Sequence, residues 1–69
     1  MSNNEKLRNE IMDLRDMRVR LQRKAAELED KEFWEPEAFS PDDRYWLLYY
    51  KSAIARIKAD EQALRNQMR

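Results

Sequence analysis

Leucine recurs every seven residues through the first half of the chain, at Leu7, Leu14, Leu21 and Leu28. Ile11 and Ala25 occupy intervening positions, so the apolar spacing alternates between three and four residues. This spacing places apolar side chains along one face of a helix, as in the seam of a coiled coil. We therefore expect a helix over about residues 3–33, ending there because Pro36 disfavours helical geometry in the residue before it.

Capping signals mark the start of this helix and of a second one. Ser2 and Glu5 match a capping box. Ser40 suits an N-cap and Pro41 a first helical position, and the two aspartates that follow complement the positive end of the helix dipole. We expect the second helix over about residues 41–68. Its apolar spacing comprises Leu47, Tyr50, Ile54, Ile57, Leu64 and Met68, with Glu61 as the one polar interruption.

The 69 residues contain no Gly, no Cys and no His. Without Gly the chain cannot form a phosphate-cradling loop, and without Cys it cannot form a disulfide. A zinc site would need carboxylates alone, and catalysis would lack both a histidine base and a cysteine nucleophile. We therefore expect one small domain, residues 1–69, that is not an enzyme and binds neither a metal nor a cofactor.

A connector of about seven residues joins the two expected helices, so they should pack as antiparallel neighbours. Folding about Glu37 would bring Arg18 level with Arg56. A core of this size rarely contributes more than about 3–5 kcal/mol. Because one seam leaves other apolar flanks uncovered, we expect an all-α hairpin that self-associates into a dimeric four-helix bundle or a higher oligomer. The expected interface residues are Leu7, Ile11, Leu14, Leu21, Leu28, Trp46, Leu47, Ile54, Ile57 and Leu64.

The net charge is zero, but the charges are unevenly distributed. Residues 1–28 carry seven basic and five acidic side chains. Residues 29–43 carry one basic and seven acidic side chains, and residues 44–69 carry six basic and two acidic side chains. A hairpin would therefore be acidic at its closed end and basic towards its open end. Zero net charge argues against a duplex-DNA footprint. No apolar run approaches the roughly 20 residues that span a bilayer, so we expect a cytoplasmic protein without membrane contact.

All seven aromatic side chains lie between Phe33 and Tyr50. One interpretation is a hydrophobic plug that closes the turn and fills a dimer interface. The other is a stacking surface for a nucleobase or a partner side chain, where each stacked base contributes roughly 1–3 kcal/mol. Further along, the small side chains of Ala55, Ala59 and Ala63 form a row that permits close approach of a neighbouring helix.

Tyrosines and basic residues together form a candidate binding site for an anionic nucleotide. The candidate ligand-binding residues are Tyr45, Tyr49, Tyr50, Arg44, Lys51, Arg20, Lys24, Arg18 and Arg56. The tyrosines would stack on a base, and the guanidinium groups would clamp phosphate oxygens. Two-fold symmetry would double each cation, which suits the two phosphates of a cyclic dinucleotide. In the alternative interpretation Arg18 extends to solvent or pairs with Asp13, Asp60 or Glu61.

The turn and second helix carry a recurrent pattern, Phe39-Ser40-Pro41-Asp42-Asp43 followed by Leu47-Leu48, Tyr50, Ile54 and Arg56-Ile57. This pattern resembles small helical-hairpin proteins of tailed phages, including families of crAss-like phages. The resemblance implies a viral protein of the host cytoplasm that acts as a sponge and sequesters a cyclic nucleotide signal of anti-phage defence. The alternative is an inhibitor or scaffold of a host defence protein that acts through the acidic aromatic tip. A purely structural coiled-coil piece is the third interpretation.

Overall fold

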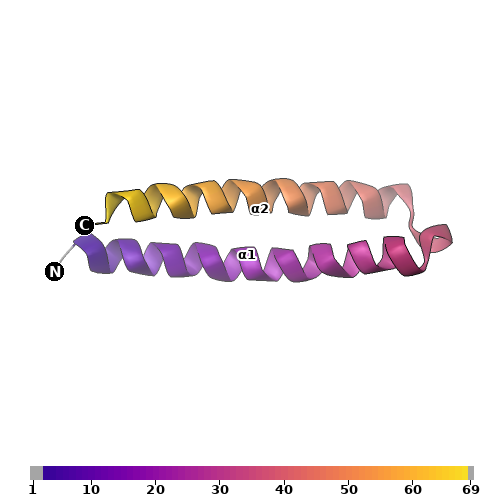
Figure 1. The fold of residues 1–69 in the computed structure, drawn as a ribbon, viewed down its shortest axis with the longest axis horizontal. Helices are drawn as coiled ribbons and strands as arrows, with labels where there is room; N and C mark the ends of the chain where they lie inside the picture. The colour runs from indigo at the N-terminus through magenta and orange to yellow at the C-terminus, as the bar shows by residue number, and fades with distance from the viewer. Residues whose placement is uncertain (1–2, 69) are drawn as a thin grey trace.

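The computed structural model describes residues 3–68 and consists of two long helices folded back on each other (Figure 1). Helix α1 spans Asn3–Trp34, the short 3-10 helix η1 spans Pro36–Ala38, and helix α2 spans Pro41–Gln67. The helices run antiparallel, and the rod measures 54 × 14 × 14 Å. Both chain ends lie at the open end, opposite η1. The expected all-helical hairpin is therefore confirmed, and its helix bounds agree to within a residue.

One seam of side chains joins the two helices, and its burial follows the 3/4 spacing on both of them. On α1 the seam consists of Asn4, Leu7, Ile11, Leu14, Arg18, Leu21, Ala25, Leu28 and Glu32. On α2 it consists of Asp43, Leu47, Tyr50, Ile54, Ile57, Glu61, Leu64 and Met68. Of residues 3–68, only Ala25, Leu47, Ile57 and Glu61 are buried, while the rest of the seam is half-buried. The predicted periodicity is confirmed, but the core of a single hairpin is thin.

Nine of the ten expected interface residues lie in this seam, and Trp46 does not. Its side chain is 47% exposed, because it falls one position before Leu47 and therefore about 100° around α2. Trp46 was expected among the interface residues, but it does not lie within the seam between α1 and α2. Trp46 instead packs at the edge of the seam, with its ring centroid 6.0 Å from that of Tyr50.

The closed end is held by a capping box and an ion pair. The Ser40 hydroxyl accepts a hydrogen bond from the Asp43 amide at 3.1 Å, and the Asp43 carboxylate accepts one from the Ser40 amide at 3.0 Å. Lys31 on α1 reaches the same carboxylate at 2.8 Å. The predicted start of α2 at Ser40 and Pro41 is confirmed. The start signal predicted at Ser2 lies outside the described residues.

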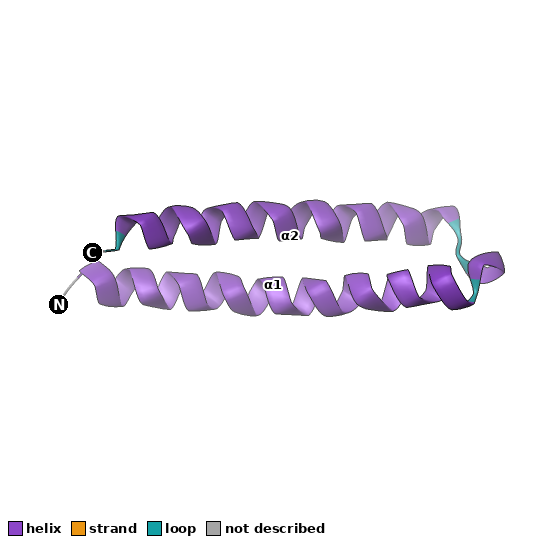
Figure 2. Cartoon of the chain, in the orientation of Figure 1, coloured by secondary structure: helices purple, strands orange, loops and turns teal. Residues whose placement is uncertain are grey.

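The connector between the helices is short, and Figure 2 shows only brief loop segments on either side of η1. Phe39 is half-buried in this turn, and the Arg44 guanidinium lies over its ring, 5.4 Å from the centroid. In contrast, Phe33 and Trp34 are 73% and 75% exposed. A plug within the hairpin therefore involves Phe39 but not Phe33 or Trp34. Neither α1 nor α2 has an apolar stretch that would span a bilayer.

Candidate interaction surface

A charged pair lies inside the apolar seam. The Arg18 Nε donates to both oxygens of the Glu61 carboxylate, at 3.1 and 3.2 Å. The side chains are only 19% and 6% exposed, so this pair is largely shielded from water. Of the alternatives left open by the sequence, pairing with Glu61 is the one that the structure contains. The guanidinium that was a candidate phosphate clamp is therefore occupied by a carboxylate of its own chain.

The expected layer of Arg18 and Arg56 does not form. Arg56 is exposed, and it lies about 140° around α2 from Glu61, the residue that Arg18 contacts. The simple register about Glu37 holds for Lys31 and Asp43 but ignores that the two flanks of a helix pair are offset along the axis. For this reason the expected register is wrong at Arg18.

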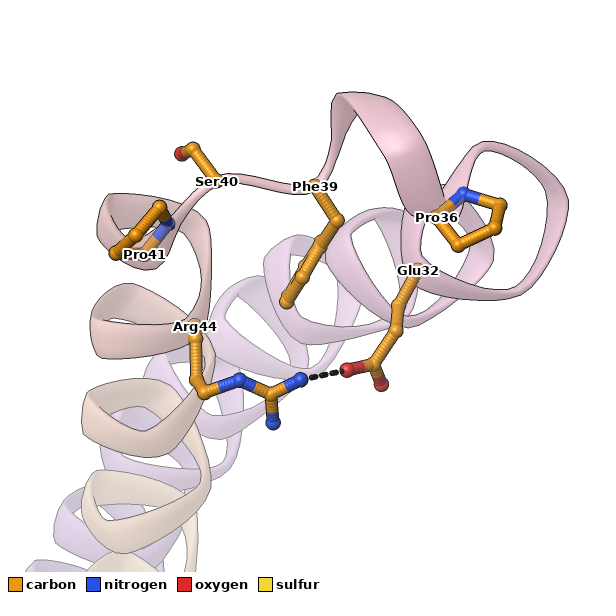
Figure 3. A pocket seen from close by; sticks show the side chains of 6 residues that line it. All are labelled: Glu32, Pro36, Phe39, Ser40, Pro41 and Arg44. Atoms are coloured by element: carbon orange, nitrogen blue, oxygen red, sulfur yellow. Dashed lines mark hydrogen bonds and ion pairs between the residues drawn. The ribbon is translucent and has the colours of Figure 1, made fainter.

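Two further candidate cations are also paired with carboxylates of α1. Arg44 contacts Glu32 at 2.6 Å, and Lys51 contacts Glu29 at 3.3 Å. Figure 3 shows Glu32 and Arg44 reaching toward each other across a hollow of about 340 Å³ beside Phe39. Because its acidic and basic groups neutralise each other, this hollow is a structural part of the turn rather than an anion site.

The three candidate tyrosines have different environments. Tyr50 is half-buried in the seam, whereas Tyr45 and Tyr49 are 62% and 53% exposed. Trp46 joins the exposed pair, since its ring makes edge-to-face contacts with Tyr45 at 5.4 Å and with Tyr49 at 5.6 Å. These three rings form a continuous aromatic cluster on the first two turns of α2, which we call the aromatic cluster.

The nine candidate ligand-binding residues therefore do not converge on one site. Arg44 and Lys51 lie on one flank of the hairpin, and each has an acidic partner there. Tyr49 and Arg56 lie together on the other flank, where they line a groove of about 450 Å³. Its full lining is Leu14, Met17, Tyr49, Ser52, Ala53, Arg56, Ile57 and Asp60. The remaining candidates on α1, Arg20 and Lys24, are exposed and do not line this groove.

The side of α2 that points away from the seam is almost free of charge. By helical position it consists of Asp42, Tyr45, Leu48, Tyr49, Ser52, Ala55, Arg56, Ala59, Gln62, Ala63 and Asn66, which we call the α2 outer face. Every one of these side chains is exposed, and only Asp42 and Arg56 are charged. The face therefore contrasts with an ordinary solvated helix face, which is rich in charged residues.

The corresponding side of α1 provides an internal comparison. It consists of Glu5, Lys6, Asn9, Met12, Asp13, Asp16, Val19, Arg20, Arg23, Ala26, Glu27, Asp30, Phe33 and Trp34. Eight of these fourteen residues are charged, as expected for a helix face in water. The two helices share one seam, but their outer sides differ in charge, with eight of fourteen residues charged on α1 and two of eleven on α2.

The sequence already revealed the alanine row, but not that Tyr45 and Tyr49 of the aromatic cluster lie on the same side of α2 as that row. That relationship requires knowing which residues form the seam. Among residues 3–68 no group of three acidic side chains is placed to hold a metal ion. Comparison with family models, curated proteins and solved structures finds no match to this chain.

Proposed function

We propose that this protein is a non-enzymatic binding module that self-associates through the α2 outer face and contacts a partner protein through its tip. The observation that carries the proposal is the nearly uncharged, fully exposed α2 outer face. Covering it would add apolar burial to a hairpin whose own seam contains only four buried residues among those described. Small helical domains commonly gain stability in this way, as four-helix bundles assembled from two hairpins.

Sedimentation of matched variants tests the self-association. The wild-type chain should sediment as a dimer or larger assembly at micromolar concentration. Ala59→Lys places a charge in the middle of the α2 outer face and should give a monomer. Ala26→Lys makes the same change at an exposed position of α1 and should leave the assembly intact. A wild-type monomer that retains full helicity would overturn the proposal.

The tip offers a second surface with distinct chemistry. Phe33 and Trp34 pack edge to face, with centroids 4.8 Å apart, and remain largely exposed beyond the end of the seam. Glu35 and Glu37 follow them directly and are also exposed. An exposed tryptophan beside acidic groups suits an apolar pocket with a basic rim on a partner protein, because tryptophan is a frequent anchor at interfaces.

Affinity capture with two variants tests the role of the tip. Immobilised wild-type protein should retain a partner from bacterial lysate in a fixed ratio, and Trp34→Ala should lose it. Met12→Ala removes a comparably exposed apolar side chain from the outer side of α1 and should retain the partner. Equal retention by both variants would show that the tip is not the contact surface.

The nucleotide-sponge interpretation keeps one supporting observation. Tyr49 and Arg56 line the same groove, two helical turns apart, so the groove offers one ring for stacking and one guanidinium for a phosphate. The groove borders the α2 outer face, so a two-fold axis there would supply two copies of each. Calorimetry with cyclic dinucleotides and cyclic ADP-ribose derivatives tests this second candidate. Binding that is lost in Arg56→Ala but kept in Arg20→Ala would support it, and no heat across the panel would exclude it.

A further inference from the structure

We infer that the second copy lies antiparallel on the α2 outer face, so that the closed end of one hairpin sits beside the open end of its partner. This inference rests on the proposed self-association and adds its geometry. Two independent patterns support it. One is the distribution of side-chain size along the α2 outer face, and the other is the concentration of negative charge at the closed end of the rod.

Side-chain size changes from large to small along the α2 outer face. The large side chains, Tyr45, Leu48 and Tyr49, belong to its first part, and 62%, 59% and 53% of each is exposed. The alanine row of Ala55, Ala59 and Ala63 occupies the remainder. Protein interfaces are packed as densely as interiors when large groups of one surface fill hollows in the other.

A parallel pair would place like against like. The large residues would meet at one end and hold the helices apart, while the alanines would leave a gap at the other end. An antiparallel pair centred near Ile54, the midpoint of α2, places Tyr45 opposite Ala63 and Tyr49 opposite Ala59. Two of the three large side chains then meet a methyl group, while Leu48 lies opposite Asp60 at the margin of the contact. The antiparallel arrangement therefore packs evenly, whereas the parallel one does not.

The negative charge of the rod is concentrated at its closed end. Residues 29–43, which form this end, carry seven acidic side chains and one basic side chain. Glu35, Glu37 and Asp42 among them are exposed and make no ion pair within the described part of the chain. The nearby basic groups Lys31 and Arg44 are already paired with other carboxylates. The tip is therefore left with uncompensated negative charge.

The open end carries no such surplus. Residues 3–16 and 57–68, which form it, together carry five basic and six acidic side chains. A parallel dimer would set two acidic tips side by side, where they repel each other. An antiparallel dimer places each acidic tip beside the nearly neutral open end of the partner subunit, so charge and size favour the same orientation.

Cysteine cross-linking tests the orientation. Because the sequence contains no Cys, each introduced cysteine provides the only thiol of its chain. Asp42→Cys and Asn66→Cys place one thiol near each end of the α2 outer face. These sites are roughly 36 Å apart along one helix at 1.5 Å per residue, so a short bismaleimide cannot bridge them within a chain. One variant is labelled with ¹⁵N, so that the three covalent products of a mixture differ in mass. Ala26→Cys, on the outer side of α1, reports random collisions.

The antiparallel dimer predicts that the mixture gives the labelled–unlabelled product well above the Ala26→Cys background. Each variant alone should stay at that background. A dimer that cross-links like with like, or that gives no product above background, overturns this orientation while leaving self-association in place. A monomer in sedimentation of the wild-type chain overturns the self-association and the orientation together. The two proposals can therefore fail separately.

Discussion

Arg18 reaches across the seam to Glu61, with its Nε within 3.2 Å of both carboxylate oxygens. This charged layer sits between apolar layers of the seam, where Leu14 and Leu21 are its neighbours on α1 and Ile57 and Leu64 on α2. Pairs of this kind contribute little net stability, because removal of both groups from water offsets their attraction. Their loss is costly mainly when one partner is left behind.

Removing one member of the pair should therefore cost more than removing both. We expect Glu61→Leu to lower the free energy of unfolding by about 1–3 kcal/mol, because the Arg18 guanidinium keeps its charge without a partner. The double variant Arg18→Leu/Glu61→Leu should recover most of that loss or exceed the wild type. Urea denaturation followed by circular dichroism, at a fixed protein concentration, measures the free energy of unfolding of the wild type and of both variants. A double variant no more stable than Glu61→Leu would contradict this account.

The capping hydroxyl of Ser40 should contribute measurably to stability. Ser40→Ala removes the acceptor of the Asp43 amide and should cost about 1 kcal/mol. Ser52→Ala is the matched control, since Ser52 is exposed in the middle of α2 and alanine is the better helix former there. Thermal melts should show a lower Tm for the first variant and an equal or higher Tm for the second. An equal decrease in Tm for both variants would show that the Ser40 cap does not contribute to stability.

Stability should depend on pH through Asp43. The hydrogen bond from Lys31, and then that from the Ser40 amide, hold the pKa of Asp43 below its ordinary value of 3.8. A depressed carboxyl pKa means that the contribution to stability is complete above about pH 4 and is lost as pH falls through the depressed value. Asp43→Asn should therefore melt below the wild type at pH 7, and the two melting curves should converge near pH 2–3.

The neighbouring Asp42 provides the control for that experiment. Asp42 makes no ion pair among residues 3–68. Asp42→Asn therefore breaks no link to α1, whereas Asp43→Asn breaks the ion pair with Lys31. Its difference from the wild type at pH 7 should be smaller. A gap between wild type and Asp43→Asn that persists unchanged to pH 2 would show that the effect is not one of protonation.

Salt should distinguish the antiparallel dimer from a parallel one. The antiparallel arrangement keeps the two acidic tips apart, whereas a parallel arrangement sets them side by side, where screening by salt relieves their repulsion. The screening length falls from about 10 Å at 0.1 M salt to about 3 Å at 1 M. Sedimentation equilibrium in 50 mM and 500 mM sodium chloride should therefore show a dimer Kd that changes by less than about threefold. A Kd that falls about tenfold as salt rises would indicate tips placed side by side.

Much of the fold could be predicted because the local signals agree. The leucine heptads, the Ser40-Pro41 start and the position of Pro36 each limit the helices, and they point to the same hairpin. The pairing of Arg18 with Glu61 could not be derived by folding the chain about one residue, because flanking positions of antiparallel helices are offset. The exposure of Phe33 and Trp34 could not be predicted either, because their hydrophobicity does not reveal that the seam ends before them.

The structure differs from the sequence-based expectation more at the candidate binding site than in the fold. Arg18, Arg44 and Lys51 were chosen as free cations, but each has a carboxylate of its own chain within 3.3 Å. The sequence does not reveal which cations lie beside a carboxylate of the other helix. Packing shows it: Arg18, Arg44 and Lys51 have such a partner, whereas the candidates Arg20, Lys24 and Arg56 make no ion pair within residues 3–68.

The exposed Trp34 sits at one end of a rod 54 Å long. In an antiparallel pair the two copies of this side chain would point away from each other, at opposite extremes of the assembly. Such a particle is bivalent, but its two binding ends cannot both reach one small partner. It would instead bridge two partner molecules held apart at a fixed spacing, and it would gain avidity only from targets that are themselves repeated, such as a filament, a ring or an array.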